Sequence, residues 1–541
     1  MIIGIDFDNT IARYDSSFKE IALIEGLINE NWKGKTKTEI RNYLRSLPDG
    51  ETKWMKLQGL VYGKYMNKAE MMPGVANFLL KCKQNNYKVL IISHKTEYGH
   101  FDTERISLRK QALKWMTYKR FFDPDYFALK KENIFFAETR KKKLDLISKS
   151  NCEYFIDDLP ELFKEKYFPD GPKKILFLRS NTTDLPENTT ILKNWEDIYI
   201  HIFGFINDKD VKIWAKHLSG KNIISIKKIS GKGNSQIFKI KADDKKKYAL
   251  KYYPNLLIDD RPRLITEYNA FNFLHMFNIS NVPESINKDV DLNLGLYVWI
   301  EGTKITETTP YRLSQLINFA KQLYIISQNI SKQYNTIDLA SEACLSRHDI
   351  IIQVEKRYNR LKAIENNHND LTSFLNNCFE PLWQKIKQKS YNIWPEESKF
   401  ESLPKEKQIL SPSDFGLHNT IEKSGNLIFI DFEYFGWDDP VKLTSDVIWH
   451  PAMSFTNDQA SIWKNSMLKL FSNDLNFKNR LQAALPLFGM RWIMILLNEF
   501  LPGLIEKRKK ASNVNNYDKN MIRETQLKKA KKYCKILEID F

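Results

Sequence analysis

Cysteine is scarce in this chain of 541 residues, and what there is forms no recognisable pattern. There are five cysteines, an odd number, and no two of them are spaced as a C-x-x-C pair. They are Cys82, Cys152, Cys344, Cys378 and Cys534. This distribution excludes a disulfide scaffold and argues against a structural zinc site. It is typical of a protein in a reducing compartment, and we expect a cytoplasmic one.

The sequence also lacks the features of a secretory leader and of a membrane span. Its first eight residues resemble a strand and contain an acid by the sixth position, which is unlike a signal peptide. The most apolar stretch, Leu485–Leu501, contains Arg491 and Glu499, so we expect it to be too polar to cross a membrane. No internal repeat is present. The sequence therefore predicts a soluble chain and leaves its oligomeric state open.

Charge of one sign is in excess, because 83 basic residues stand against 66 acidic ones and give a net charge of +17. This excess favours anionic partners such as phosphate esters, nucleotides, nucleic acid or an acidic membrane face. Hydrophobic residues make up 42% and aromatic residues 13%, which is enough for buried cores and excludes a disordered chain. At roughly 100–200 residues per domain, the length predicts two to four domains.

The first 205 residues alternate short apolar runs with helical patterns, which is typical of a Rossmann-like α/β domain. The expected strands are Ile2–Phe7, Lys88–Ile92, Asn133–Phe136, Tyr154–Ile156 and Ile175–Phe177. A long insertion, about residues 13–72, follows the first strand and has mostly helical apolar spacing. We expect this insertion to form a helical cap over the strand ends.

Residues 206–541 form a second predicted domain of a different class. It is β-rich over about residues 208–302 and helical from 303 to 541, which predicts an α+β fold with two lobes. The expected strands and helix of the first lobe are Ile223–Ile229, Gln236–Lys241, Tyr248–Tyr252, Gly295–Ile300 and a helix around Arg263–Phe277. A short β-like segment, Asn426–Asp431, interrupts the helical lobe.

Asp6, Asp8 and Thr10 form a D-x-D-x-T motif at the end of the first expected strand, where open α/β sheets bind ligands. Adjacent carboxylates are costly there unless a cation neutralises them, and their oxygens suit Mg²⁺. The same residues also make a good turn, so the motif alone does not decide between a turn and a site. Further polar residues follow or flank later strands: Ser93, Lys143, Asp157 and Asp158.

This order of motifs resembles the haloacid dehalogenase (HAD) superfamily over about residues 1–205. The resemblance implies that Asp6 attacks phosphorus to form an aspartyl-phosphate, and that Asp8 protonates the leaving oxygen and then activates water. An acid at the position of Asp8 fits phosphatases and not dehalogenases. By the same resemblance, phosphoryl oxygens would be held by Thr10, Ser93 and Lys143, and Mg²⁺ by Asp6, Asp8, Asp157 and Asp158.

The resemblance leaves open which basic residue binds phosphate, and it gives the substrate only as a broad class. Lys143 competes with Arg140, Lys141 and Lys142 for the phosphate-binding role, since a solvated basic run would account for at least two of the four. The helical cap implies a small phosphorylated substrate, because a cap closes over the site and excludes water.

A second series of motifs lies in the second domain. A turn containing Ser230, Gly231 and Gly233 joins two expected strands, and its small residues would let backbone N–H groups approach phosphates. A plain hairpin turn explains it equally well. Lys251 ends the next strand and Glu267 lies on the following helix, a pair that orients nucleotide phosphates in kinases but is also an ordinary salt bridge elsewhere.

Asn419 lies five residues after Asp414, which is the catalytic-loop spacing of kinases. Asp431 ends a short strand further on, where a second metal ligand belongs. The series resembles the aminoglycoside phosphotransferase and choline kinase branch of the protein-kinase-like fold. One departure is that Pro412-Ser413 replaces the His-Gly that usually precedes the catalytic aspartate, which we interpret as the mark of a subfamily.

This second resemblance implies specific roles. Asp414 would accept the proton of the acceptor hydroxyl or orient it, while Asn419 and Asp431 would hold Mg²⁺ on ATP, the phosphate donor. Nucleotide binding would use Ser230, Gly231, Gly233, Lys251, Glu267 and Glu301, the last in a hinge-like segment. His418 is expected to be structural, and Glu433 either assists the metal or has a packing role.

Together the motifs predict a bifunctional enzyme, with a Mg²⁺-dependent phosphomonoesterase and an ATP-dependent kinase whose acceptor is an alcohol. Sugars, polyols or amino alcohols and their phosphates are the expected substrates. The sequence around Asp414 resembles kinases of bacterial surface-polysaccharide gene clusters, which implies a role in capsule precursor synthesis. The alternatives are nucleic-acid end processing, antibiotic phosphorylation and a regulatory protein with inactive sites. Nucleic acid is disfavoured, because no aromatic-interleaved basic stripe is present.

Overall fold

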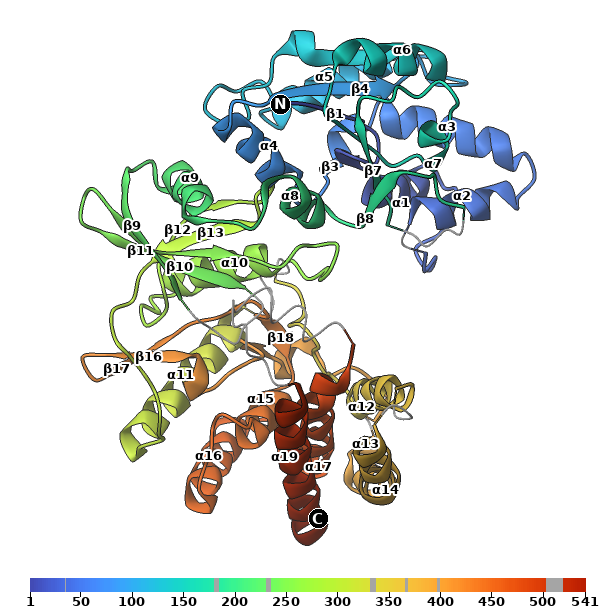
Figure 1. Cartoon of the computed structure of the whole chain (residues 1–541). Coiled ribbons are helices and arrows are strands. Elements are labelled where there is room, and N and C mark those ends of the chain that lie inside the picture. The colour runs from blue at the N-terminus through green and yellow to red at the C-terminus, as the bar shows by residue number, and fades with distance from the viewer. Residues whose placement is uncertain are drawn as a thin grey trace. The chain divides into compact units, whose positions relative to one another are not determined.

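A computed structural model of the chain describes residues 1–34, 36–179, 184–229, 235–330, 337–364, 368–396, 399–502 and 519–541. The N-terminal part contains a six-stranded parallel sheet with the order β5-β4-β1-β6-β7-β8 (Figure 1). Its strands are β1 (Ile2–Ile5), β4 (Lys88–His94), β5 (Ile134–Ala137), β6 (Tyr154–Asp157), β7 (Lys173–Phe177) and β8 (Thr189–Leu192). The predicted alternation of strands and helices is therefore present as a parallel α/β sheet.

The order of these strands makes β1 the point where the chain changes direction across the sheet. From β1 the chain runs outward to β4 and β5, and then returns to β6 on the other side of β1. The carboxyl ends of β4, β1 and β6 are consequently neighbours, and such a switch point is where open α/β sheets bind ligands. The helices of this part are α4 (Val75–Gln84), α5 (Leu108–Tyr118), α6 (Arg140–Ser150), α7 (Pro160–Phe163) and α8 (Trp195–Phe203), with the short η2 (Lys131–Asn133).

The insertion after β1 is helical, as its apolar spacing predicts. It consists of α1 (Asp15–Ile24), α2 (Lys37–Arg45), α3 (Gly50–Tyr62) and η1 (Met66–Lys68). Phe18 of α1 stacks on Trp54 of α3 with the ring centroids 5.1 Å apart, so the insertion has an apolar centre. The insertion leaves and re-enters the domain through β2 (Ala12–Arg13) and β3 (Glu70–Met71), which pair antiparallel. The sequence does not predict this pair, because two residues are too few to show a periodicity.

The β-rich lobe of the C-terminal part is a five-stranded antiparallel sheet with the order β12-β13-β11-β10-β9. Its elements are β9 (Ile223–Ile229), β10 (Gln236–Ala242), β11 (Lys247–Tyr252), α10 (Arg263–Met276), β12 (Ser285–Asp289) and β13 (Leu294–Val298), preceded by α9 (Asp208–Ser219). The polar sequence of β12 gives no strand signal, and its pairing with β13 is what makes it a strand. The turn with Ser230, Gly231 and Gly233 lies outside the described residues.

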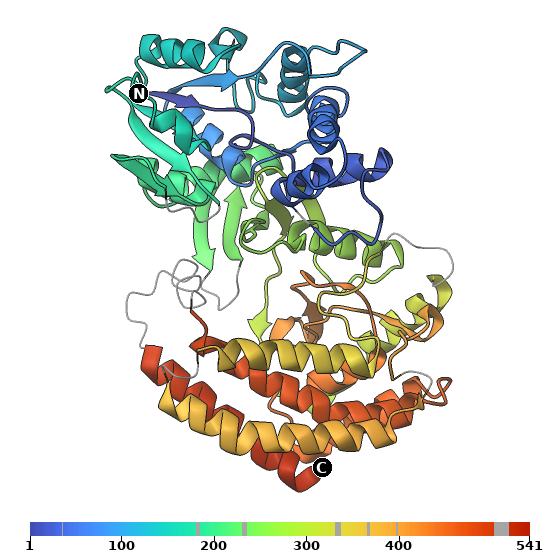
Figure 2. The same ribbon diagram turned by 90° about the vertical axis from the view of Figure 1, so that its right-hand side faces the viewer.

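Helices dominate the rest of the chain and lie alongside one another (Figure 2). They are α11 (Pro310–Ile330), α12 (Arg347–Lys362), α13 (Asn369–Phe374), the π-helical η4 (Leu375–Phe379), α14 (Glu380–Ile393), α15 (Pro440–Trp449), α16 (Asn457–Leu470), α17 (Phe477–Leu496), η8 (Leu497–Phe500) and α19 (Lys519–Asp540). Helix α17 contacts α12, α14, α15 and α19. The segment Phe477–Phe500 is long and apolar enough to cross a membrane by length and composition, and 78% of its apolar window is buried within the fold, as in a core helix.

Short strands between these helices carry the expected catalytic segments of the C-terminal part. They are β14 (Thr303–Lys304), β15 (Ile409–Ser411), β16 (Thr420–Lys423), β17 (Asn426–Phe429) and β18 (Gly436–Asp438), with the helical turns η6 (Lys405–Lys407) and η7 (Leu417–Asn419). Asp414 lies in the loop between β15 and η7, and Asp431 follows β17. Because β16 pairs with β17, the loop and the segment after β17 are held next to each other.

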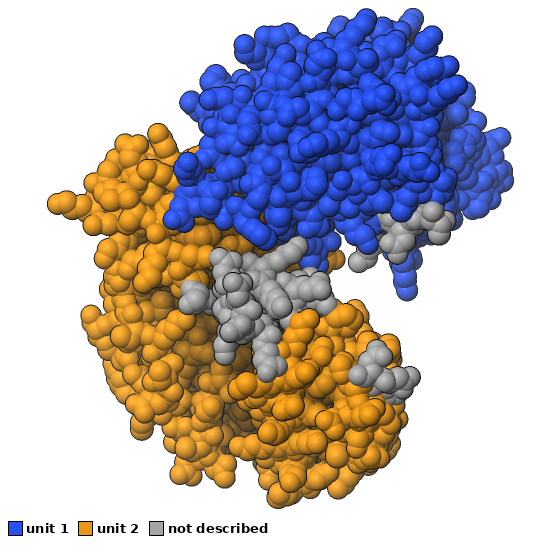
Figure 3. All heavy atoms as spheres, in the orientation of Figure 1, with its two compact units in different colours: residues 1–210, 255–258 blue, residues 211–254, 259–541 orange. Residues whose placement is uncertain are grey.

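The chain divides into two compact units, coloured separately in Figure 3. Unit 1 comprises residues 1–210 and 255–258, and unit 2 comprises residues 211–254 and 259–541. The sequence places the domain boundary at residues 205 and 206.

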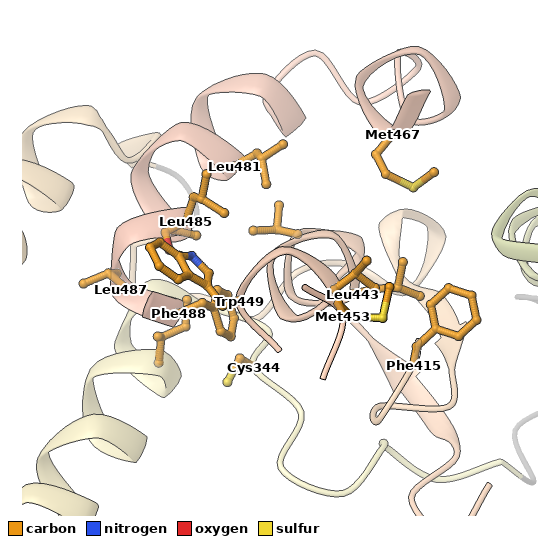
Figure 4. Close-up of a cluster of buried hydrophobic side chains, with 14 of the residues drawn as sticks. Cys344, Phe415, Leu443, Trp449, Met453, Met467, Leu481, Leu485, Leu487 and Phe488 are labelled. Atoms are coloured by element: carbon orange, nitrogen blue, oxygen red, sulfur yellow. The ribbon is translucent and has the colours of Figure 1, made fainter. Parts of the chain in front are cut away.

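An apolar core in unit 2 fixes the loop that carries Asp414. Figure 4 shows Phe415 near Leu443 and Met453, all of them buried. Phe415 also stacks on Phe319 of α11, with the ring centroids 5.9 Å apart. Because the residue after Asp414 is anchored in this way, the polar side chains of the loop have a defined position.

Candidate active sites

Unit 1 gathers acidic side chains at the carboxyl edge of its sheet. Asp6 follows β1 and Asp157 ends β6, and Lys143 of α6 lies between them. The Nζ of Lys143 is 2.5 Å from Asp6 Oδ1 and 2.6 Å from Asp157 Oδ2. All three side chains are almost entirely buried. Oxygens of Asp6, Asp157 and Asp158 lie within 4.8 Å of one another, so they could share one ion.

The four basic residues at the start of α6 have different surroundings. Arg140, Lys141 and Lys142 are exposed, whereas Lys143 is buried on the acidic pair. Lys141 and Lys142 point away from the face of Lys143, and Arg140, one turn before Lys143, lies at the helix start and pairs with Glu165 at 2.9 Å. Of the four candidates for the phosphate-binding residue, Lys143 thus contacts the acidic side chains, and the other three are exposed.

The pKa values of the acidic side chains in this cluster are raised, which indicates that Lys143 alone does not balance their negative charge. Burial raises the pKa of Asp6 to about 7; Lys143 opposes this rise, and the nearby Asp157 carboxylate adds to it. Burial also raises the pKa of Asp158 well above its usual range, helped by Asp157 and Asp6. Neighbouring carboxyl groups with raised pKa values are stabilised in their ionised form by a bound cation. Their oxygens suit a hard divalent ion such as Mg²⁺, which would be held by Asp6, Asp157 and Asp158.

Asp8 lies apart from this group, although the sequence places it among the metal ligands. Its Oδ1 accepts a hydrogen bond from the Tyr14 hydroxyl at 2.5 Å, and Lys95 Nζ lies 3.0 Å from Oδ1 and 2.8 Å from Oδ2. Tyr14 and Lys95 are both buried. Its carboxylate is thus fixed by two donors, which suits proton transfer more than metal binding.

Two further predicted residues differ in what they can contact. Ser93 is buried, and its Oγ has no hydrogen-bond partner within the described ranges, so a phosphoryl oxygen would satisfy it. Thr10 is fully buried, and its hydroxyl lies 3.5 Å from Asp158 Oδ1. The hydroxyl of Thr10 thus lies at hydrogen-bond distance from Asp158, beside the acidic cluster.

In unit 2, Lys251 of β11 lies among three carboxylates. Its Nζ is 2.8 Å from Glu267 Oε2, 2.7 Å from Asp431 Oδ1 and 2.7 Å from Glu433 Oε1. Burial acts to lower the pKa of Lys251, but the three acids outweigh it and hold the pKa well above its usual range. A permanently charged lysine beside clustered carboxylates is the arrangement expected for phosphates of a metal–nucleotide complex.

Glu433 is paired with two cations in this cluster. It forms an ion pair with Arg263 as well as Lys251, and it accepts a hydrogen bond from Ser235 Oγ at 2.6 Å. Burial acts to raise the pKa of Glu433, but the charges of Lys251 and Arg263 lower it to about 2. Both of its oxygens are thus paired with cations, and one oxygen also lies within 4.8 Å of oxygens of Glu267 and Asp431.

Glu301 is placed differently from the other predicted nucleotide-binding residues. Its side chain is exposed and is bound by Lys239 at 2.9 Å and by Lys247 at 2.6 Å. Its carboxylate is thus paired with lysines of β10 and β11, and any nucleotide contact at this position would use the backbone.

Asp414 is held by side chains from its own loop. His418 Nε2 lies 3.0 Å from Asp414 Oδ1, and Asn419 Nδ2 donates to Asp414 Oδ2 at 3.1 Å. Since its amide nitrogen is used in this way, only the amide oxygen of Asn419 can bind a metal ion. Burial acts to raise the pKa of Asp414, but the hydrogen bond and charge of His418, then His450 and Asn419, hold it well below its usual range.

His450 is a neighbour of Asp414 that the sequence does not reveal. It caps the C-terminus of α15, its ring stacks on that of His418 with the centroids 3.8 Å apart, and its Nε2 lies 3.6 Å from Asp414 Oδ1. The backbone N–H of Ala452 donates to His450 Nδ1 at 3.2 Å, so the ring hydrogen is on Nε2, which faces Asp414. No local spacing links His450 to the loop, which explains why sequence reasoning misses it.

The departure at Pro412-Ser413 has a structural counterpart. Ser413 has a positive φ of 66°, and its Oγ accepts a hydrogen bond from Lys442 Nζ at 2.9 Å. Lys442 is itself bound by Asp438 at 2.9 Å and Asp446 at 3.3 Å. A buried ionic network therefore orders the loop at Ser413, next to Asp414.

No protein-family model matches the chain, and no curated protein matches it. Solved structures that it resembles include a spectinomycin phosphotransferase in complex with ADP and spectinomycin (13% identity, TM-score 0.39, 59% of this chain and 98% of that one). They also include an ethanolamine kinase from Plasmodium vivax (13% identity, TM-score 0.38, 60% of this chain and 89% of that one). A third is a choline kinase from Streptococcus pneumoniae (14% identity, TM-score 0.37, 60% of this chain and 98% of that one). These identities and TM-scores do not establish a shared activity, so function has to be inferred from the two sites themselves.

Proposed function

We propose that this protein is a bifunctional enzyme, in which unit 1 hydrolyses a phosphomonoester and unit 2 transfers phosphate from ATP to an alcohol. The observation that carries the proposal is that each unit gathers three carboxylates around one buried lysine, Lys143 in unit 1 and Lys251 in unit 2. Such clusters are costly unless they bind a cation and an anionic ligand, and a magnesium-bound phosphoryl group supplies both.

In unit 1, Asp6 is the nucleophile. Its carboxylate attacks phosphorus and forms an aspartyl-phosphate as the alcohol leaves, and Asp8 gives the leaving oxygen a proton. Asp8 then takes a proton from the water that attacks the aspartyl-phosphate, which returns Asp6 to its starting form. Ser93 and Lys143 hold phosphoryl oxygens. Bound Mg²⁺ would neutralise charge on the phosphoryl oxygens.

In unit 2, Lys251 binds the phosphates of ATP, and Glu267 and Glu433 hold its ammonium group in position. Asp414 orients the acceptor hydroxyl for in-line attack and accepts its proton as transfer proceeds. Asn419 and Asp431 would hold Mg²⁺, which neutralises charge on the transferred group.

The substrates we propose are small sugars, polyols or amino alcohols and their phosphates, in the synthesis of a surface polysaccharide in the cytoplasm. Support comes from the resemblance of the loop around Asp414 and of the segment after Asp431. The two sites act on different groups, because a site that removed the phosphate added by the other would only hydrolyse ATP.

The test uses the full chain and two single variants, Asp6→Asn and Asp414→Asn. Each is incubated with Mg²⁺, with and without ATP, and a panel of sugars, polyols, amino alcohols and their phosphates. Asp6→Asn should lose phosphate release from esters and keep acceptor-dependent ADP formation, and Asp414→Asn should show the reverse. No activity of the wild type with any member would refute the proposal, as would one variant that abolishes both activities.

A further inference from the structure

Lys37 of the inserted helices is the one lysine near the unit 1 site, among the described residues, that has no acidic partner. Lys95 and Lys143 each bind a carboxylate within 3.0 Å. Lys37 forms no ion pair within 4.0 Å in the ranges described, and its Nζ instead donates to the Tyr62 hydroxyl at 2.7 Å. An ammonium group has three hydrogens to donate, so a bond to one neutral hydroxyl leaves donors for an anion.

The position of Lys37 is fixed by its backbone. It is the first residue of α2, where Thr36 and Glu39 form a reciprocal capping box. Its backbone N–H donates to Asp15 Oδ1 at 3.1 Å, and Asp15 Oδ2 lies 3.1 Å from Arg179. The side chain then passes between aromatic rings, with Nζ 5.4 Å from the ring centres of both Phe18 and Tyr62. Little rotamer freedom would remain to be lost when a ligand binds.

Contacts of Tyr62 connect Lys37 with the catalytic groups. Lys95, which binds Asp8, has its Nζ 5.1 Å from the centre of the Tyr62 ring. The ring of Tyr14, whose hydroxyl also binds Asp8, lies 4.8 Å from that of Tyr62. Burial acts to lower the pKa of Lys37, but Tyr62 and then the charges of Asp158 and Asp8 raise it. Lys37 is therefore a charged group within electrostatic reach of the site.

We propose that Lys37 and Tyr62 form a subsite for a second anionic group of the unit 1 substrate, a carboxylate or a second phosphate on the alcohol that leaves. The Tyr62 hydroxyl accepts from Lys37 and keeps its own hydrogen to donate, so the pair offers an ammonium and a phenol to one anion. The inference rests on the proposed phosphatase and narrows its substrates to phosphate esters with a further negative charge.

The test compares kcat/KM for phosphate release from ester pairs that differ in one anionic group. One pair is phosphoglycerate and glycerol phosphate, which tests a carboxylate, and the other is fructose bisphosphate and fructose phosphate, which tests a second phosphate. The wild type should prefer the more anionic member of at least one pair. In Lys37→Met the preference should fall about tenfold or more, since a hydrogen bond to a charged group is lost. Lys37→Arg should retain most of it.

Matched variants separate the subsite from a general charge effect. Lys33→Met removes the same charge from an exposed position just before α2 and should keep the wild-type preference. Tyr62→Phe keeps the ring and removes the hydroxyl, so it should weaken the preference and can replace Lys37→Met if that variant fails to fold. A wild type that releases phosphate from both members of each pair equally would overturn the subsite and leave the phosphatase standing. Release from no ester at all would overturn the phosphatase itself.

Discussion

Unit 1 and unit 2 both place an aspartate at the centre of a candidate site, yet the surroundings of Asp6 and Asp414 act in opposite directions. Burial raises the pKa of Asp6 to about 7, even though Lys143 lies 2.5 Å away. The Asp414 side chain is about a third exposed, and donors from His418 and Asn419 hold its pKa well below the usual range. At neutral pH Asp6 is therefore only partly ionised until a cation joins it, whereas Asp414 is ionised by its own neighbours.

This difference matches the chemistry proposed for each residue. A nucleophile must keep an accessible lone pair of high basicity, so few hydrogen bonds to it are useful. A residue that orients a hydroxyl toward a loose transition state needs a fixed direction more than basicity, and several hydrogen bonds provide it. The comparison therefore predicts that unit 1 responds strongly to changes in nearby positive charge and that unit 2 responds to loss of hydrogen-bond donors.

The largest expected effect is that of Lys143→Met in unit 1. The ammonium between Asp6 and Asp157 is lost, so phosphate release should fall by about 100- to 1000-fold, the usual cost of removing a donor to developing charge. Initial rates of phosphate release with saturating Mg²⁺ measure this. Lys142→Met, an exposed change on the same helix, is the control and should keep the wild-type rate. Equal rates for the two variants would mean that the acidic cluster does not need Lys143.

A smaller effect is expected in unit 2 for His450→Leu. His450 Nε2 lies 3.6 Å from Asp414 Oδ1, which is too long for a hydrogen bond. Loss of this weaker contact should cost about 0.5–1.5 kcal/mol and lower kcat of phosphate transfer by about 2- to 10-fold. The affinity for ATP should stay unchanged, because His450 contacts Asp414 and not the Lys251 cluster. His450→Gln retains an N–H donor and should recover part of kcat. A parallel loss of ATP affinity and thermal stability in His450→Leu, with no recovery in His450→Gln, would point to a purely structural role; exposed His348→Leu serves as the control.

Tyr14→Phe in unit 1 should have a modest effect on phosphate release. Asp8 loses the Tyr14 hydroxyl but keeps Lys95, so one hydrogen bond of about 1 kcal/mol is removed and the rate should fall about fivefold. The measurement is kcat for phosphate release, with the exposed Tyr118→Phe as the matched change. A fall as large as that of Lys143→Met would show that Tyr14, and not Lys95, fixes Asp8.

The pH dependence should differ between the two units. At low Mg²⁺, phosphate release should decline as the pH falls below about 7, because protonated Asp6 cannot attack phosphorus. Saturating Mg²⁺ competes with this proton and should shift the decline to lower pH. The rate of phosphate transfer in unit 2 should show no such decline from protonation of Asp414, because the pKa of Asp414 is lowered. Rate profiles at two Mg²⁺ concentrations measure both; identical phosphatase profiles would contradict the interpretation of Asp6.

Local patterns were sufficient to predict residues that act within one segment. The D-x-D-x-T motif placed Asp6 and Asp8 after a strand, and the five-residue spacing placed Asn419 beside Asp414. Lys95 had a weak signal, as the second residue after Ser93 at the end of β4. His450 had none, because its position depends on the end of α15 meeting a loop distant in sequence. Tyr14 had none either, because an irregular turn, and not a periodic spacing, brings its hydroxyl back to Asp8 six residues earlier.

What the sequence determined by itself was most of the longer elements and the chemical groups at their ends, since periodicity and turn residues act over a few positions. The tertiary structure decided which of those groups meet. It selected Lys143 from a run of basic residues, turned Asp8 toward Lys95 and gave Glu433 a place in an ion pair. The reason is physical, because burial and the approach of charges from remote segments set protonation and orientation, and neither is encoded in local spacing.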